Sequence, residues 1–363
     1  MAHLDSAPGA AAHAPPLLIP EFAPQSGVIL TWPHPGTDWK PRLAEIEALY
    51  TRIAGTIVRY EPLLILCYDI RHRDHVGRLL ARGNINMQAV RLAAVKTNDT
   101  WVRDYGPITV ARANDLELYD FTFDGWGGKY PAALDNRAGR KLFDSGCFAT
   151  REFRHQQLVL EGGSIDSDGC GTLLTTRRCL LESGRNPGYG RDRLESWFRE
   201  HLGIERVLWL AHGKLAGDDT DAHVDMLARF CTPDTIVYSS CADPEDEHYT
   251  PLAAMAQQLQ TFRTREGSSY ELIPLPLPRP VRDAHGRRLP ASYANFLVIN
   301  GAVLLPVYDD PADALALDTL AGCFPERRVE PLNCLPLIHQ NGSLHCATMQ
   351  LPAGVLKRDE ETG

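Results

Sequence analysis

Short apolar segments with strand character alternate along this chain with segments whose apolar residues recur at helical spacing. That alternation is the feature that most narrows the possible folds, because it places helices between strands. The segments expected to form strands are 27–32, 63–67, 88–95, 157–160, 171–176, 206–210 and 235–238. The segments expected to form helices are 41–60, 74–83, 191–202, 252–263 and 312–323. The pattern therefore predicts an α/β fold.

Two further segments carry the turn signal of a β-hairpin, an Asn-Gly pair between apolar runs. The first hairpin is expected over 296–307, with its turn at 300–301. The second would pair 335–338 with 344–350 and turn at 341–342. The second hairpin would bring the end of the chain into a sheet.

The cysteine and glycine patterns indicate whether a metal or a nucleotide cofactor is to be expected. The chain has nine Cys, an odd number, and no Cys-x-x-Cys pair. Cys170 and Cys179 lack His partners at metal spacing, so we expect no metal site and a reduced chain without a disulfide framework. No glycine fingerprint of a nucleotide site follows a strand. The glycine-rich segment 125–129 comes closest, but no helical pattern opens there, so we expect a loop and no nucleotide cofactor.

The composition and net charge limit the kinds of partner that the chain is expected to bind. Of the 363 residues, 44% are hydrophobic and 23% are charged, as in a soluble globular protein. A formal net charge of −9 and the lack of a basic run argue against a nucleic-acid partner. No apolar run reaches the ~18 residues of a membrane span. The N-terminus has no basic region of a secretory signal, so we expect a cytoplasmic protein with no membrane partner.

We expect one catalytic α/β domain over 17–363, preceded by a disordered lead-in over 1–16 that is rich in Ala, Pro and His. The Pro-rich stretch 273–280 has the composition of a linker, but no clear composition break divides the chain. We therefore expect this stretch to be an extended surface segment inside the domain.

Cys346 lies close to the end of the chain, behind a turn signal. A thiol is a side chain that attacks an electrophilic carbon directly. A Cys beside a His near the C-terminus is, on its own, more often a packed residue than a nucleophile, and both interpretations stay open. In a strand, His345 would point to the opposite face, so it is not the obvious base for Cys346.

Acidic residues and one histidine gather far upstream of Cys346. The three acid-rich segments are 98–107, 161–164 and 218–225. In the third, a strand-like period of two places Asp221, His223 and Asp225 on one face. Flanking carboxylates favour the protonated form of a His. His223 is thus a candidate to protonate a leaving amine and later take a proton from water. A solvated acidic loop is the alternative.

The other acidic segments also have a structural and a functional interpretation. Asp104 precedes Gly-Pro and suits a turn. Trp101 either stacks on a planar cation or fills the core. Glu161 either caps a turn or faces a substrate, which the following pair of glycines would let approach the backbone closely.

Taken together, these segments resemble the agmatine deiminases of the guanidino-group-modifying superfamily, which also holds peptidylarginine and arginine deiminases. The resemblance extends over about 21–354. The segments that carry it are 31–35, 98–107, 123–130, 161–165, 217–221, 223–225, 289–296 and 345–346. It implies a five-bladed α/β propeller, or pentein, of ββαβ-type units around a central active site. Periodicity alone indicates no internal repeat.

The resemblance implies a role for each candidate residue. Cys346 is similar to the nucleophile that attacks the guanidinium carbon. Asp104 and Asp225 correspond to the pair that hydrogen-bonds the guanidinium nitrogens. His223 corresponds to the acid and base, and Glu161 to the carboxylate that orients His223 or shares its proton. The implied chemistry passes through a Cys-linked amidino intermediate and requires no metal.

The far end of the substrate decides specificity in such a family. Asp219 matches an acidic position directed towards the amine of agmatine, and Trp101 an aromatic wall beside the alkyl chain. No Arg pair is evident for a substrate carboxylate, although Arg103, Arg151 and Arg154 are present. We therefore expect agmatine as the substrate and N-carbamoylputrescine and ammonia as products.

The chain also departs from the family pattern around the nucleophile and His223. The departing positions are 340–344, Ala222 and Met226. Three alternatives therefore stay open: a deiminase of another guanidino compound, such as arginine or a C-terminal peptidyl arginine, a catalytically silent guanidino-ligand binder, and an amidinotransferase. A homodimer is the expected assembly.

Overall fold

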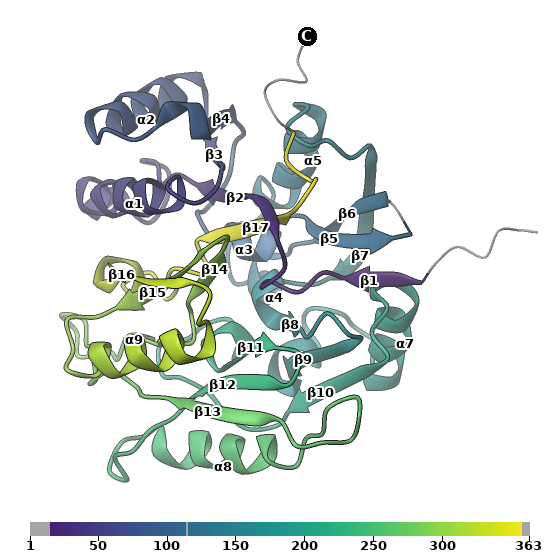
Figure 1. Ribbon diagram of the computed structural model, residues 1–363. Coiled ribbons are helices and arrows are strands. Elements are labelled where there is room, and N and C mark those ends of the chain that lie inside the picture. The colour runs from purple at the N-terminus through teal and green to yellow at the C-terminus, as the bar shows by residue number, and fades with distance from the viewer. Residues whose placement is uncertain (1–14, 114, 358–363) are drawn as a thin grey trace, which may run out of the picture.

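The computed structural model describes residues 15–113 and 115–357. Within that part of the chain the strands form five separate sheets, which Figure 1 shows arranged side by side. The first sheet has the order β17 (Thr348–Pro352), β2 (Gln25–Thr31), β3 (Leu63–Cys67), β4 (Val90–Ala94). The second has the order β1 (Pro16–Leu18), β5 (Ile108–Arg112), β6 (Asp115–Thr122), β7 (Glu152–Val159).

The remaining three sheets have three strands each. They are β8 (Ile165–Ser167), β9 (Thr172–Thr176) and β10 (Arg206–Leu210), then β11 (Ala228–Thr232), β12 (Thr235–Ser239) and β13 (Glu271–Leu275), then β14 (Leu297–Ile299), β15 (Ala302–Val307) and β16 (Arg328–Asn333). In all five sheets an antiparallel strand pair is followed by a parallel one.

A helix crosses over within every parallel pair, as parallel strands require. These helices are α1 (Leu43–Ile57), α2 (Ile70–Arg82), α5 (Ala138–Asp144), α7 (Arg191–Leu202), α8 (Tyr249–Leu259) and α9 (Ala312–Cys323). Shorter turns of helix are α3 (Val102–Tyr105), α4 (Gly125–Gly128), α6 (Arg177–Leu180) and α10 (Leu335–Ile338). The predicted α/β class is confirmed, and the repeated strand pattern is one that periodicity did not indicate.

The last strand of the described residues joins a sheet that contains a strand from near the N-terminus. Strand β17 pairs antiparallel with β2, with Thr348 opposite Leu30. Figure 1 shows the yellow β17 beside the purple β2. One cluster of buried apolar side chains takes in residues of all five sheets, among them Ile29, Val110, Leu174, Ile236 and Val303.

Most of the predicted elements are confirmed. Strands 63–67 and 206–210 and helices 191–202 and 312–323 begin and end where the sequence pattern places them. The first hairpin also forms at its Asn-Gly turn, with Ile299 paired to Ala302.

The second hairpin is wrong. Residues 335–338 form the helical turn α10, which has Pro336 in its first turn, a position that suits proline because the amide there needs no helical partner. The chain then turns through Asn341 in the left-handed region, at φ +65°. Strand β17 begins only at Thr348, so Cys346 lies in a turn ahead of the strand.

The predicted boundary of the lead-in falls partly outside the described residues, which begin at Pro15. Pro16, which the sequence assigns to the lead-in, already starts strand β1 and lies opposite Arg112. Among the residues that the structure describes, no helix has the length and apolar character to cross a membrane.

Candidate active site

Each of the five sheets contributes one segment to the site. In every case the segment immediately precedes the strand that opens the antiparallel pair, so these segments occupy equivalent places in the five sheets. The side chains delivered in this way are Asp104 before β5, Glu161 before β8, His223 and Asp225 before β11, Asn295 before β14, and Cys346 before β17. Residues distant in sequence thereby meet.

A pocket brings together every predicted site residue except Glu161. It is lined by Asp38, Asp99, Trp101, Asp104, Trp126, Tyr130, Asp218, Asp219, Thr220, His223, Asp225, Met226, Gln340, Asn341, Gly342 and Cys346. The lining among the described residues includes six Asp and neither Lys nor Arg. The residues near Cys346 are buried, whereas Asp38 is exposed and Asp99 and Asp219 are half-buried. The pocket is thus acidic from its base to its mouth.

The thiol of Cys346 lies at the base of this pocket. Its Sγ accepts a hydrogen bond from Asn295 Nδ2 at 3.2 Å and lies 3.6 Å from Asp225 Oδ2. Burial, with the nearby carboxylates of Asp225 and Asp104, raises the pKa of this thiol well above its ordinary value. The thiol is therefore protonated while the pocket holds no cation.

The two carboxylates beside the thiol have different partners. Asp104 accepts hydrogen bonds from Trp126 Nε1 and from the Gly163 backbone, both at 2.9 Å. Burial and the charge of Asp225 nevertheless raise the Asp104 pKa well above its usual value. For Asp225, burial acts in the same direction, but the hydrogen bond and charge of His345 outweigh it and lower the pKa. Asp225 Oδ1 is buried without a hydrogen-bond partner.

His223 does not lie in a strand, so the predicted period of two is wrong. Asp221 and Ala222 adopt left-handed backbone conformations, with φ of +68° and +67°, and a 3-10 turn, Val224–Met226, follows His223. His223 Nδ1 lies 3.7 Å from Asp104 Oδ1, and its Nε2 is buried without a partner.

The expectation of a protonated His223 is also wrong. Burial lowers its pKa to about 3 and outweighs the opposing charge of Asp225. Gly163 permits the crowding here, because a Cβ at this position would lie 2.8 Å from His223 Nδ1 and 2.9 Å from Asp104 Oδ1. His223 is therefore a neutral imidazole, able to accept a proton.

Glu161 lies beneath the pocket and is fully buried. Its Oε1 accepts a hydrogen bond from Arg185 Nε at 2.7 Å, while its Oε2 has no partner. Burial raises the Glu161 pKa, and Arg185 opposes that shift. Arg185 also donates to Asp221 at 2.8 Å, which places Asp221 outside the reacting group of side chains.

Glu161, His223 and Cys179 each offer a buried ligand atom, and these atoms lie within 4.8 Å of one another. Such a set could in principle hold a metal ion. The guanidinium of Arg185, however, contacts Glu161 directly and repels a cation at this place. The donor set thus fits a metal poorly.

The mouth of the pocket is built around Asp219. Its Oδ2 accepts hydrogen bonds from Tyr130 Oη at 2.7 Å and from Asn341 Nδ2 at 2.9 Å. Burial raises the pKa of the neighbouring Asp99 to about 7. Trp101 forms a buried wall, and a Cβ on Gly342 would come within 2.5 Å of its ring.

Several partners in the site were missed from the sequence. Asn295 contacts both the thiol and Asp225, with its Nδ2 3.2 Å from each. His345 bonds Asp225 Oδ2 through its Nδ1 at 2.8 Å, although the strand pattern pointed it away from the site. Trp126 and Arg185 hold Asp104 and Glu161. Asn295, Trp126 and His345 lay in segments that carried the family resemblance, but nothing in the sequence gave them a role; Arg185 lay outside those segments.

This geometry defines a class of protein: a buried thiol beside two carboxylates and a neutral histidine, in an acidic pocket, suits nucleophilic attack on a small cationic group. The model of the Porphyromonas-type peptidyl-arginine deiminase family matches residues 17–352, and the chain belongs to that family.

Three similar proteins show how closely this chain resembles known sequences and structures. The agmatine deiminase of Ectopseudomonas mendocina is 33% identical, over 92% of this chain and 94% of its own. A Porphyromonas gingivalis structure provisionally named an arginine deiminase has a TM-score of 0.89 and 46% identity, covering 94% of this chain and 100% of that one. The C. jejuni agmatine deiminase, solved as a Cys-to-Ser variant with substrate bound, has a TM-score of 0.87 and 33% identity, covering 97% and 100%.

Proposed function

We propose that this chain hydrolyses the guanidino group of agmatine, giving N-carbamoylputrescine and ammonia. The observation that carries the proposal is the charge of the pocket, which has carboxylates both around Cys346 and at its mouth and neither Lys nor Arg among its described lining residues. Agmatine is a dication with a guanidinium at one end and an amine at the other. A site that is acidic at both ends suits such a molecule, and the agmatine deiminases among the relatives support the choice.

The placement of the arginines argues against an amino-acid substrate. A carboxylate on the substrate would call for a cationic partner. Arg103 is buried and engaged with Glu21 and Gln350, away from the lining of the pocket. Arg154 bonds Glu117, and Arg151 is exposed on another part of the molecule. An amine is therefore favoured over the α-carboxylate of arginine.

Binding of the guanidinium prepares the thiol. Asp104 and Asp225 receive the planar cation through charge-assisted hydrogen bonds, for which Asp225 Oδ1 is free. A positive charge beside Cys346 opposes the effect of the two carboxylates on the thiol, so its pKa falls on binding. The neutral His223 then takes the thiol proton, and the thiolate attacks the guanidinium carbon.

Loss of ammonia completes the first half of the reaction. The new S–C bond gives a neutral tetrahedral adduct, and His223 returns its proton to one amino nitrogen. The C–N bond breaks, ammonia leaves, and an amidino group linked to Cys346 remains. The buried Glu161 stabilises the imidazolium that forms on His223.

Water completes the second half. His223 removes a proton from the water that attacks the amidino carbon, and a second tetrahedral adduct forms. Collapse of this adduct breaks the S–C bond, and the departing thiolate takes the proton from His223. The hydroxyl proton of the adduct passes to water as the carbonyl forms, which balances the charge of the cationic substrate. The products are the ureido compound and ammonia, and the free thiol is restored.

We also propose an overall architecture and a cellular location for this chain. The five similar sheets and the pairing of β17 with β2 support a closed five-bladed propeller with the pocket at its centre. The shared apolar core supports a single domain. A cytoplasmic homodimer that acts in polyamine synthesis towards putrescine stays a prediction.

One experiment tests the proposed function directly. Purified protein is incubated with agmatine, arginine and a peptide ending in arginine, and the ureido product and ammonia are quantified with Cys346→Ala as the control. We expect product from agmatine alone, and none from the variant. Product from arginine instead would favour the second candidate function, an arginine deiminase, which the 46% identity to the Porphyromonas gingivalis structure supports. No product from any of the three would contradict both.

A further inference from the structure

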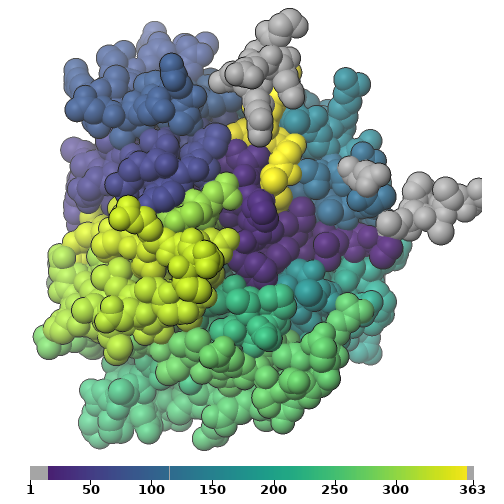
Figure 2. All heavy atoms as spheres, in the orientation of Figure 1, coloured from purple at the N-terminus to yellow at the C-terminus, as the bar shows by residue number. Residues whose placement is uncertain are grey.

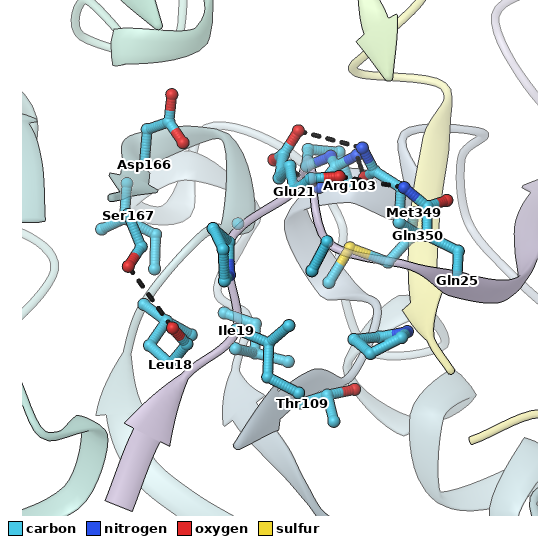
Figure 3. A pocket seen from close by; sticks show the side chains of 16 residues that line it. Leu18, Ile19, Glu21, Gln25, Arg103, Thr109, Asp166, Ser167, Met349 and Gln350 are labelled. Atoms are coloured by element: carbon cyan, nitrogen blue, oxygen red, sulfur yellow. Dashed lines mark hydrogen bonds and ion pairs between the residues drawn. The ribbon is translucent and has the colours of Figure 1, made fainter. Parts of the chain in front are cut away.

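The segment between β1 and β2 is the starting point of a second set of contacts to the site. Figure 2 shows this purple segment lying across the centre of one face, between the yellow-green C-terminal part and the teal middle part of the chain. It lines a pocket together with Arg103, Asp166 and Gln350. Figure 3 shows the Glu21 carboxylate of this segment beside the Arg103 guanidinium, and Gln350 on the other side of that guanidinium.

Glu21 is held by four partners. Its carboxylate accepts hydrogen bonds from Arg103 Nη1 at 3.0 Å, from Gln350 Nε2 at 3.0 Å and from Arg229 Nη2. Its two oxygens also lie 2.9 and 2.8 Å from His345 Nε2. Burial would raise the Glu21 pKa, but Arg103, Arg229 and His345 together lower it well below its usual value. Glu21 is therefore a fixed anion under the site.

His345 links this anion to the reacting carboxylate. Its ring is fully buried, and its Nδ1 lies 2.8 Å from Asp225 Oδ2 while its Nε2 faces Glu21. Because both ring nitrogens face carboxylate oxygens, two hydrogen atoms are needed to make both contacts hydrogen bonds. Burial and the two guanidinium groups lower the His345 pKa, whereas Glu21 and Asp225 act in the opposite direction.

Asp225 and His345 each have several charged or titratable groups around them. The charged or titratable groups that face Asp225 are Asp104, His223, His345, Cys346 and Arg229. Those that face His345 are Glu21, Arg103, Arg229 and Asp225. Asp166 pairs with Arg229 at 3.1 Å but does not touch His345. One chain of side-chain contacts from Glu21 to the thiol therefore passes through His345 and Asp225. Arg103 makes a second connection, because it bonds Glu21 and its backbone nitrogen donates to the Cys346 carbonyl at 3.2 Å.

We propose that Glu21 and His345 are positioning residues for Asp225. The imidazole, anchored by Glu21, holds Asp225 Oδ2 and leaves Oδ1, which has no partner, free to receive the guanidinium. The same contact keeps Asp225 ionised beside the buried thiol. This inference rests on the proposed function, since it assigns the roles of two further residues in that reaction.

The first test compares Glu21→Gln with Asp166→Asn in the full chain. Both variants remove a carboxylate that bonds Arg229, but only Glu21 contacts His345. We expect Glu21→Gln to lower kcat/KM for agmatine by about 10- to 100-fold, the range typical of residues that orient a reacting ligand. We expect its acid limb to move to higher pH, because Asp225 then holds a proton more strongly. Equal profiles in the two variants would overturn the inference.

The second test asks whether an amide restores the contact. In His345→Asn the side-chain amide can still donate to Asp225, whereas His345→Leu removes the donor. We expect the Leu variant to lose more of kcat/KM than the Asn variant, with melting temperatures that verify folding of both. Leu and Asn variants of equal activity would show that the hydrogen bond to Asp225 has no positioning role.

A measurement without substrate separates this inference from the proposed function. In 15N-labelled protein titrated across pH, we expect the His345 ring to gain its second hydrogen at a lower pH in Glu21→Gln than in the unaltered protein or in Asp166→Asn, because Glu21 contacts the ring and favours its protonated form. Uptake of the second hydrogen at the same pH in all three proteins would overturn the inference. Turnover of agmatine by the unaltered protein is judged apart from this result, so either claim can fail alone.

Discussion

The base and the mouth of the pocket both present carboxylates, but in different surroundings. At the base, Asp104 and Asp225 are both buried. The Trp126 indole and a backbone amide donate to Asp104, while the His345 imidazole and the Asn295 amide bond Asp225. At the mouth, Asp38 is exposed and Asp219 is half-buried. The comparison indicates that the base is organised for reaction, where geometry must be exact to a fraction of an ångström, and that the mouth is organised for recognition of charge.

Removing the nucleophile should produce the largest effect at the base. We expect Cys346→Ser to lower kcat by about 10⁴-fold or more, as loss of a nucleophile does in other enzymes, while the fold is retained. Cys170→Ser is the control, because Cys170 is an exposed free thiol outside the pocket. Steady-state turnover of agmatine by both variants checks this. Substantial activity in Cys346→Ser would remove Cys346 from the reaction.

The next effect is expected from the paired carboxylates. Asp104→Asn keeps the size of the side chain and can still accept from Gly163, but it removes the charge that faces the guanidinium. We expect kcat/KM for agmatine to fall by about 10²- to 10³-fold, with most of the loss in kcat, because the charge stabilises the reacting cation. Near-normal turnover of the variant would place Asp104 outside the reacting group.

The mouth should respond differently. We expect Asp219→Asn to raise KM for agmatine by about tenfold, the effect of losing one partly exposed charge contact, and to change kcat little. An alkylguanidine of equal chain length that lacks the amine is the matched control substrate, and its KM should be the same for both proteins. A fall in kcat as large as that of Asp104→Asn would break the distinction between base and mouth.

The smallest of the expected effects is the change of kcat/KM for agmatine with pH. Since the Asp99 pKa is raised to about 7, its carboxylate is neutral below that pH and charged above it. We expect kcat/KM for agmatine to rise by a few-fold as pH increases through about 7, and Asp99→Asn to lose this rise. A rise of the same size in Asp99→Asn would assign it to another group.

Local signals in the sequence were sufficient to predict most individual helices and strands, but not how these elements assemble. The Asn-Gly turn at 300–301 and the helical spacing over 191–202 depend on near neighbours, and both predictions were right. The turn at 341–342 has the same Asn-Gly signal, yet the structure places a helix before it. There the long-range pairing of β17 with β2 decides the outcome. The repeat of five sheets lies in strand pairing, which short-range periodicity does not reveal.

The site was predictable to the extent that its residue types carry chemistry. The thiol, His223 and most of the acidic residues were identified, and of these all but Glu161 and Asp221 line one pocket. Their protonation was not predictable in the same way. Flanking carboxylates argued for a charged His223, but its burial in three dimensions lowers its pKa to about 3. The partner His345 was missed because its orientation depends on a turn that was expected to be a strand.

In the proposed reaction, Cys346 carries the amidino group during turnover at the base of the pocket. Mass spectrometry of protein quenched with acid while it turns over agmatine tests this most directly. We expect the peptide containing Cys346 to gain the mass of agmatine less ammonia, and the adduct to disappear when substrate is consumed. Turnover without any adduct, or an adduct on Cys179 instead, would contradict it.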